Sequence, residues 1–163
     1  MDIKFIELVK KYADKLPELV PREEFSELRF GCLDGCAYCC KEYLLIVPET
    51  DLQAKLNKGL VSTSISWLKA MKKEKGACVY LHESKCSIQS TKPLACKGYP
   101  FFVDPYTEKV YLDAKCKGIG QGEIITLAQE NEMINYRKIY WGLIGLSEEE
   151  KKIISQSYFK KKF

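Results

Sequence analysis

The chain has 163 residues, of which 46% are hydrophobic and 29% are charged, and its formal net charge at pH 7 is +4. This length fits one compact domain, and this composition excludes a disordered or fibrous protein. Much of the positive charge lies in short lysine runs, so the charge alone does not indicate a nucleic-acid-binding protein.

The N-terminal residues carry charges where a signal peptide has its apolar region, and no stretch contains the roughly 18 uncharged apolar residues of a membrane span. We therefore expect a cytoplasmic protein with no membrane partner. In a reducing compartment, cysteines serve as metal ligands more often than they form disulfides. The cytosol of a hyperthermophile is the exception, so disulfides are the alternative use of the cysteines.

The first part of the chain predicts helices around one strand. Residues 2–16 have apolar side chains at helical spacing, and Pro17 ends that helix. The apolar run 43–47 predicts a buried strand. Two further helices are predicted over residues 51–58 and 63–73.

The middle of the chain predicts two hairpins around a short helix. The first hairpin has residues 78–81 on one arm and 86–88 on the other, with a cysteine on each arm. Pro93 suits the first turn of a short helix. Residues 101–103 and 109–112 flank a loop with turn-forming residues and predict the second hairpin.

The last third is predicted to be helical. After a glycine-rich bend over residues 118–122, residues 123–140 have helical periodicity, and Ser147 with Glu150 forms a capping box for a final helix. We therefore predict an α+β fold: a small single domain, residues 1–163, in which helices surround cysteine-bearing loops and short β-hairpins. Residues 30–120 are expected to be its metal-binding core, and residues 121–163 its C-terminal helical part.

Eight cysteines are the strongest functional signal. Four lie within nine residues and four follow at wider intervals: Cys32, Cys36, Cys39, Cys40, Cys78, Cys86, Cys96 and Cys116. One buried cysteine is only a small apolar side chain, whereas a Cys-x2-Cys turn can place two thiolates on one ion. We therefore predict that all eight cysteines are metal ligands.

The neighbours Cys39 and Cys40 favour two separate sites. In extended backbone, adjacent side chains point to opposite faces, so the eight thiols divide into two groups of four. Either tetrahedral zinc or a [4Fe–4S] cluster fits four thiolates, and the sequence does not assign each cysteine to its group. The single histidine, His82, is an alternative ligand. Six lysines near cysteines in the sequence can offset thiolate charge: Lys41, Lys85, Lys92, Lys97, Lys115 and Lys117.

The cysteine pattern and its flanking residues resemble a known family. The first cluster ends in Cys39-Cys40, residues 92–100 read Lys-Pro-Leu-Ala-Cys-Lys-Gly-Tyr-Pro, and a Cys-Lys-Gly-Ile-Gly segment begins at Cys116. Together these segments resemble the CxxCxxCC cysteine-cluster family, which is described as zinc- or iron-chelating and is related to the flagellin lysine N-methylases. The resemblance covers about residues 30–120 and implies metal binding. The chain departs from the family in its Cys32-x3-Cys36 spacing and in lysines where the family more often has arginine.

The sequence leaves the purpose of the metal open. The leading expectation is a binding or scaffold module with a structural metal. A protein-lysine methylase-like or iron–sulfur redox enzyme is the alternative. Its single glycine-rich candidate for an S-adenosylmethionine loop is residues 118–122, which follow a cysteine instead of a strand, so a flexible bend explains them better. Cys32-x3-Cys36-x2-Cys39 also looks like the radical S-adenosylmethionine signature, but no βα alternation follows it. Lysine clusters near C-terminal aromatic residues suggest RNA or a ribonucleoprotein as a further partner.

Overall fold

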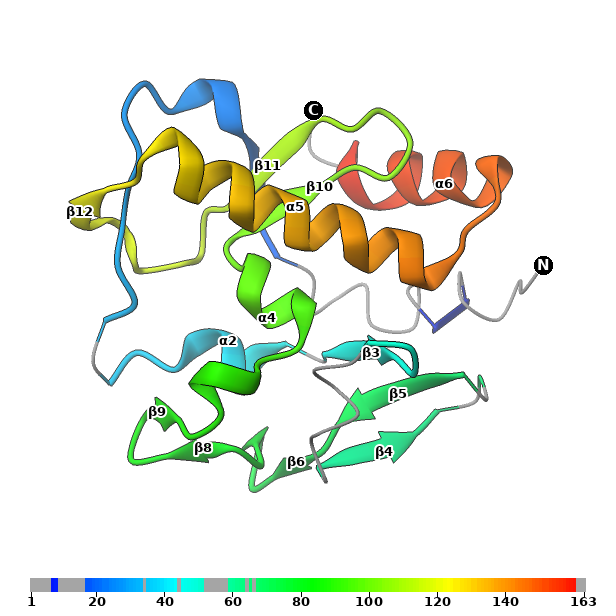
Figure 1. Cartoon of the computed structure of the whole chain (residues 1–163), viewed down its shortest axis with the longest axis horizontal. Helices are drawn as coiled ribbons and strands as arrows, with labels where there is room; N and C mark the ends of the chain where they lie inside the picture. Colours follow the sequence, from blue (N-terminus) through cyan, green and yellow to red (C-terminus); the bar gives the residue numbers. More distant parts are fainter. Residues whose placement is uncertain are drawn as a thin grey trace.

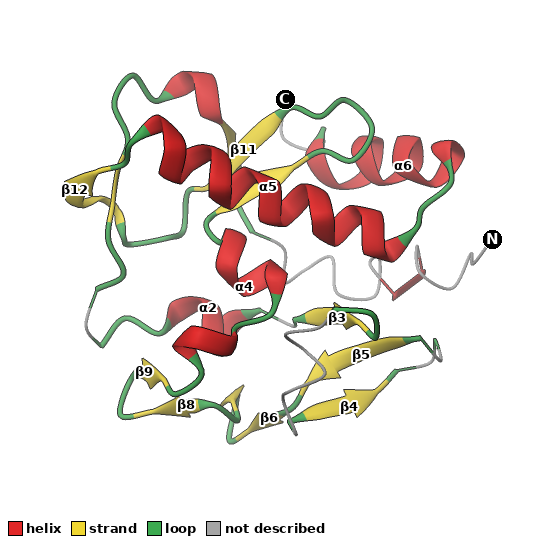
Figure 2. Cartoon of the chain, viewed as in Figure 1, coloured by secondary structure: helices red, strands yellow, loops and turns green. Residues whose placement is uncertain are grey.

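The computed structural model describes residues 7–8, 17–33, 35–43, 45–51, 59–63, 65 and 67–160. Helices and short strands alternate along these residues, and the strand pairs among them are antiparallel (Figure 2). The predicted α+β fold is therefore confirmed. No helix in the described ranges is long and apolar enough to cross a membrane.

A three-stranded sheet lies against the long helix α5 (Leu127–Ile144) (Figure 1). Its strands have the order β1 (Leu19–Pro21), β11 (Val110–Asp113), β10 (Phe101–Val103). Strands β10 and β11 confirm the predicted hairpin. Helix α5 also packs against α4 (Leu94–Gly98), the predicted short helix, whose N-cap is Pro93.

The predicted glycine-rich bend is part of a strand pair. A short 3-10 helix, η2 (Arg22–Glu24), leads to β2 (Arg29–Phe30), which pairs with β12 (Ile119–Ile124). The register shifts within β12, where Gly120 and Gly122 have φ angles of 83° and 74°. Glycine adopts such angles without the strain that a side chain would bring, so the bend and the strand are compatible.

A second three-stranded sheet and two small hairpins form the other side of the molecule (Figure 1). The sheet has the order β3 (Ile46–Pro48), β5 (Leu68–Met71), β4 (Leu60–Ser62). The hairpins are β6 (Lys73–Glu74) with β7 (Ala77–Cys78), and β8 (Leu81–His82) with β9 (Lys85–Cys86), followed by η3 (Gln89–Thr91). Cys78 and Cys86 therefore lie in different hairpins, whereas the sequence predicted one hairpin carrying both.

The helix predicted over residues 63–73 is wrong. Its apolar spacing suits a helix, but Thr63 Oγ1 accepts a hydrogen bond from the amide of Ile65 at 3.1 Å and organises a turn instead. After this turn, β5 pairs with β3 on one edge and β4 on the other. Pairing with distant residues thus overrides the local periodicity. The predicted helix 51–58 lies almost wholly outside the described residues, as does helix 2–16, of which residues 7–8 are helical.

The C-terminal helices follow their local signals. Helix α6 (Glu148–Ile154) has the predicted capping box, in which the Glu150 amide donates to Ser147 Oγ at 3.2 Å. Helix α5 begins later than residue 123 because Thr126 and Gln129 form another capping box. The chain then continues from α6 into one π-helical turn, η4 (Ser155–Phe159).

The buried residues of the hydrophobic core are unevenly distributed along the sequence. Its main cluster joins α5, α6 and η4 to both three-stranded sheets, through Leu19, Leu68, Tyr111, Tyr140, Ile144, Ile154 and Phe159 among others. In contrast, the stretch from Lys72 to Lys92, all of which is described, has no buried residue. Apolar packing therefore does little to hold the two small hairpins that carry Cys78 and Cys86.

Candidate metal centre

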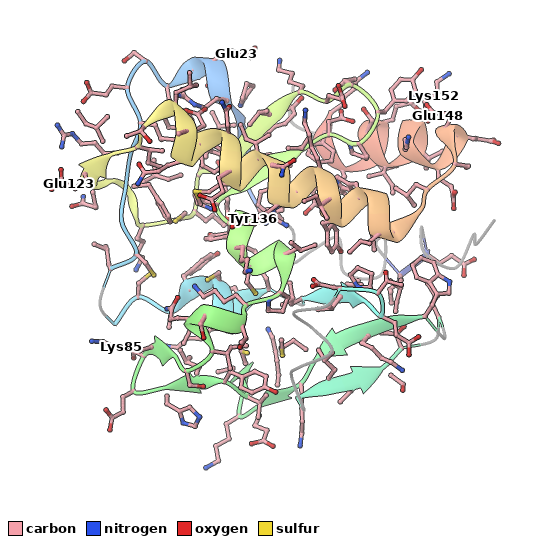
Figure 3. All side chains as sticks on the ribbon, viewed as in Figure 1. Glu23, Lys85, Glu123, Tyr136, Glu148 and Lys152 are labelled. Carbon is pink, nitrogen blue, oxygen red and sulfur yellow. The ribbon has the colours of Figure 1, made fainter. Side chains whose placement is uncertain are left out.

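All eight cysteines line one cavity of about 460 Å³. They come from the loop after β2, from helix α2 (Tyr38–Glu42), from β7, β9 and α4, and from the turn after β11. Figure 3 shows the yellow sulfur atoms around α2 and between α2 and β12. All eight residues are described and each is a free thiol; Cys32 is exposed and the other seven are half-buried. The fold thus brings thiols as distant in the sequence as Cys32 and Cys116 to the wall of one cavity.

The neighbours Cys39 and Cys40 lie on a helix rather than on extended backbone. Successive side chains of an α-helix project about 100° apart, so the two side chains do not point to opposite faces as expected from the sequence. The Cys39 thiol donates a hydrogen bond to the Cys40 sulfur, which raises the pKa of Cys39 and lowers the pKa of Cys40 to about 7. In the metal-free protein the pair therefore keeps one proton on Cys39 more readily than on Cys40.

Cys40 lies near two of the dispersed cysteines, and a third lies near one of these two. The charge of Cys40 acts on Cys78 and Cys96, and Cys78 in turn interacts with Cys86 and Cys96. Helix α2 packs directly against β7, which explains how Cys40 comes close to Cys78. Burial raises the pKa of Cys96 to about 12. A bound cation would favour the thiolate at Cys96, which the protein alone disfavours.

The other cysteines lie where β2 and β12 meet. The Gly31 amide donates to the Gly118 carbonyl at 3.1 Å, and a Cβ on Gly118 would lie 2.4 Å from the Gly31 carbonyl oxygen. This close approach brings the turn of Cys116 beside the loop of Cys32. Cys32 also acts electrostatically on Cys39.

The backbone near two of the cysteines favours the thiolate form. The backbone at Gly118 and Ile119 acts to lower the pKa of Cys116, and the backbone at Tyr80 acts to lower the pKa of Cys78; the Ile119 amide itself donates to the Cys116 carbonyl at 3.2 Å. Burial raises the pKa of both thiols, and these backbone groups act in the opposite direction. A lowered pKa favours the thiolate, which is the form that binds metal. The donor set therefore fits a zinc ion or an iron–sulfur cluster.

A buried carboxylate supports the Cys116 end of the cavity. Asp113 is fully buried and accepts hydrogen bonds from the hydroxyls of Tyr43 and Tyr99, the latter at 2.8 Å. It also accepts from the amide of Glu18 at 3.0 Å. The Tyr99 hydroxyl lies within hydrogen-bonding reach of the Cys116 sulfur as well. Burial, followed by the effect of Asp113, raises the pKa of both tyrosines, so they remain hydrogen-bond donors at neutral pH.

Some of the six lysines that the sequence predicted near cysteines lie near the thiols in the structure, and others do not. Lys92 lies near Cys40 and Cys96, and Lys85 and Lys117 line the cavity. The Nζ atom of Lys97 instead lies over the ring of Tyr136, 5.4 Å from the ring centre. Lys41 and Lys115 are exposed and lie outside the cavity lining.

Sequence reasoning missed several residues of this site. Lys73 lies near Cys40 and Cys78, and Arg137 lies near Cys96. Tyr43 and Tyr99 were missed as well, because tyrosine has no ligand spacing that a sequence pattern would reveal. His82 is exposed on β8 and is not part of the cavity lining, so the structure does not support it as a ligand. Within the described ranges, no three Cys, His, Asp or Glu side chains stand close enough together to hold a single ion, and the thiols are spread over the cavity wall.

Comparison with known proteins gives one result. The model of the CxxCxxCC family, described as "Putative zinc- or iron-chelating domain", matches residues 31–118. No curated protein and no solved structure matches the chain. The matched residues contain all eight cysteines and begin and end at the two glycines, Gly31 and Gly118, that join β2 to β12.

Proposed function

The chain belongs to the CxxCxxCC family of zinc- or iron-chelating domains, and from this premise we propose that it holds two metal centres, each bound by four thiolates, that stabilise its fold. The main support is that all eight thiols face a single cavity. Either a zinc ion or a [4Fe–4S] cluster takes four thiolate ligands.

The residues around each thiol suggest how the eight cysteines are divided between the two proposed metal sites. The first proposed site contains Cys40, Cys78, Cys86 and Cys96, which are linked through mutual electrostatic effects. The second proposed site contains the remaining four, Cys32, Cys36, Cys39 and Cys116. The turns of Cys32 and Cys116 are joined by the Gly31–Gly118 hydrogen bond, which supports this site. Cys32 also acts on Cys39, although Cys40 and Cys96 of the first site act on Cys39 more strongly, so Cys39 lies between the two proposed sites.

A structural role explains how the two small hairpins are held. Each has a ladder of two residue pairs, and an isolated two-stranded hairpin is marginally stable in water. The stretch Lys72–Lys92 has no fully buried residue, and apolar packing is limited to half-buried side chains such as Val79 and Tyr80, which lie against Gly59. A four-thiolate zinc site contributes on the order of 10 kcal/mol to folding, which is enough to order these hairpins.

Elemental analysis of protein purified without oxygen tests the number of centres. We expect two zinc ions per chain in a colourless protein, or about eight irons with equal sulfide in a brown one. A metal content below one equivalent, or an unchanged thermal midpoint after chelation, would contradict the proposal.

Paired variants test the proposed division. Cys78→Ser combined with Cys86→Ser removes two ligands of one site, and we expect it to lose one metal centre. Cys86→Ser combined with Cys116→Ser affects both sites, and we expect it to lose two. Equal losses in the two double variants would show that the division is wrong while leaving metal binding itself intact.

A further inference from the structure

Arg137 on α5 is a buried arginine that lines the same cavity. Its side chain and backbone together are 7% exposed, and its Nε donates to the carbonyl of Phe101 at 2.6 Å. No acidic side chain of the described residues forms an ion pair with it. A buried charge is costly unless it is paired, so an anion is expected beside this guanidinium.

The nearer metal site does not need this charge. This step depends on the proposed function: four thiolates with Zn²⁺, or with a [4Fe–4S]²⁺ core, carry a net charge of about −2. Lys73 and Lys92 both lie near Cys40 and already match that charge. Arg137, which also acts on Cys96, adds a third positive charge at this end of the cavity, one more than the charge of about −2 requires.

The guanidinium is held in a fixed orientation. The aliphatic part of Arg137 packs against Gly98 of α4, where a Cβ would lie 2.9 Å from its Cγ. Its guanidinium carbon lies 4.2 Å from the centre of the Phe102 ring. Because Nε is already bonded, the two terminal nitrogens are left for a ligand. Such a fork matches the two oxygens of one carboxylate.

The cavity wall around Arg137 is aromatic. The Tyr140 hydroxyl donates to the Ile46 carbonyl at 3.1 Å and the Trp141 indole donates to the Val103 carbonyl at 2.8 Å, so both rings turn apolar surface to the cavity. The Tyr158 hydroxyl also lies here and has no hydrogen-bond partner among the described residues. In Figure 1, α5 lies across α4 from α2, β8 and β9.

We propose that this aromatic end of the cavity binds a small organic carboxylate, whose carboxyl group pairs with Arg137 and whose apolar body lies against the rings. The whole cavity of about 460 Å³ is also lined by the eight thiols, and the proposed ligand would occupy only its aromatic end. The ligand would sit beside the thiolates without being one of their metals.

Calorimetric titration of the metal-loaded full-length chain tests the proposal. The probes are phenylacetate, 3-phenylpropionate and 2-naphthoate, each compared with its neutral amide. We expect at least one acid to bind with a dissociation constant below about 5 mM, and its amide to bind at least about tenfold more weakly because it lacks the charge. Binding by none of the acids, or equal binding of acid and amide, would overturn the proposal.

Variants then identify the residue that recognises the carboxylate charge of the ligand. Arg137→Gln should remove the preference for the acid, whereas Arg29→Gln, at an exposed arginine, should keep it. Tyr158→Phe should weaken binding of the acid about three- to tenfold and provides a second measurement if Arg137→Gln does not fold. Metal content is measured on every variant. If Arg137→Gln loses a metal centre and no acid binds the wild type, Arg137 is a counter-charge for the thiolates, which refutes the ligand site but not metal binding.

Discussion

Replacing Cys78 by serine removes one thiolate from a segment that has little other support. Cys78 ends β7, is half-buried, and lies in the stretch Lys72–Lys92 that buries no residue. If a structural site is worth about 10–16 kcal/mol, one of its four ligands contributes roughly 2.5–4 kcal/mol. For a chain of this length, that loss corresponds to a fall of about 5–15 °C in the thermal midpoint. In metal-free protein the same substitution should cost less than about 0.5 kcal/mol, because the side chain is half-exposed.

The assay is calorimetric unfolding of the metal-loaded and metal-free proteins under anaerobic conditions, with metal content measured in each. Ser87→Ala is the matched control in the same segment, since it removes one exposed hydrogen bond from Ser87 Oγ to the Tyr80 carbonyl. We expect this control to change the midpoint by less than about 2 °C. If Cys78→Ser keeps full metal content and the wild-type midpoint, the reasoning about the first site is refuted.

Three further predictions follow from single residues. In metal-free protein, the rate of alkylation at Cys40 should rise as the pH passes about 7, because only the thiolate reacts and the pKa of Cys40 is lowered to about that value. Cys96, with a pKa of about 12, should stay unreacted at pH 8. Peptide mass spectrometry measures the alkylation of both residues, and equal rates would contradict this prediction. Gly118→Ala should destabilise the protein by about 1–3 kcal/mol in denaturant unfolding, because the added Cβ would lie 2.4 Å from the Gly31 carbonyl oxygen. The control Gly142→Ala has open space around the added Cβ on α5 and should stabilise the protein by up to about 1 kcal/mol. Asp113→Asn should lower stability by about 1–3 kcal/mol because the buried carboxylate accepts hydrogen bonds from two tyrosines, and an unchanged denaturation midpoint would show that the network is unimportant.

Predictions that rest on local chemistry agree with the structure. The capping box of Ser147 and Glu150, the position of Pro93 before a helix, and the hairpin around residues 104–108 each depend on residues a few positions apart. Such signals act wherever the chain lies in the fold, so the sequence alone carries them.

Features that depend on distant residues required the tertiary structure. Residues 63–73 have helical periodicity, yet strands β3 and β4 pair with both edges of β5 and hold it extended. The neighbours of Cys40, the burial of Arg137 and the hydrogen bonds of two tyrosines to Asp113 likewise arise from segments that meet only after folding. The sequence by itself determined that this protein carries eight thiols within a domain of a zinc- or iron-chelating family; the packing of α2, α4, β7 and the β2–β12 pair decided which thiols are neighbours. The physical reason is that hydrogen-bonded ladders and burial couple residues by distance in space, whereas spacing and capping couple them by distance along the chain.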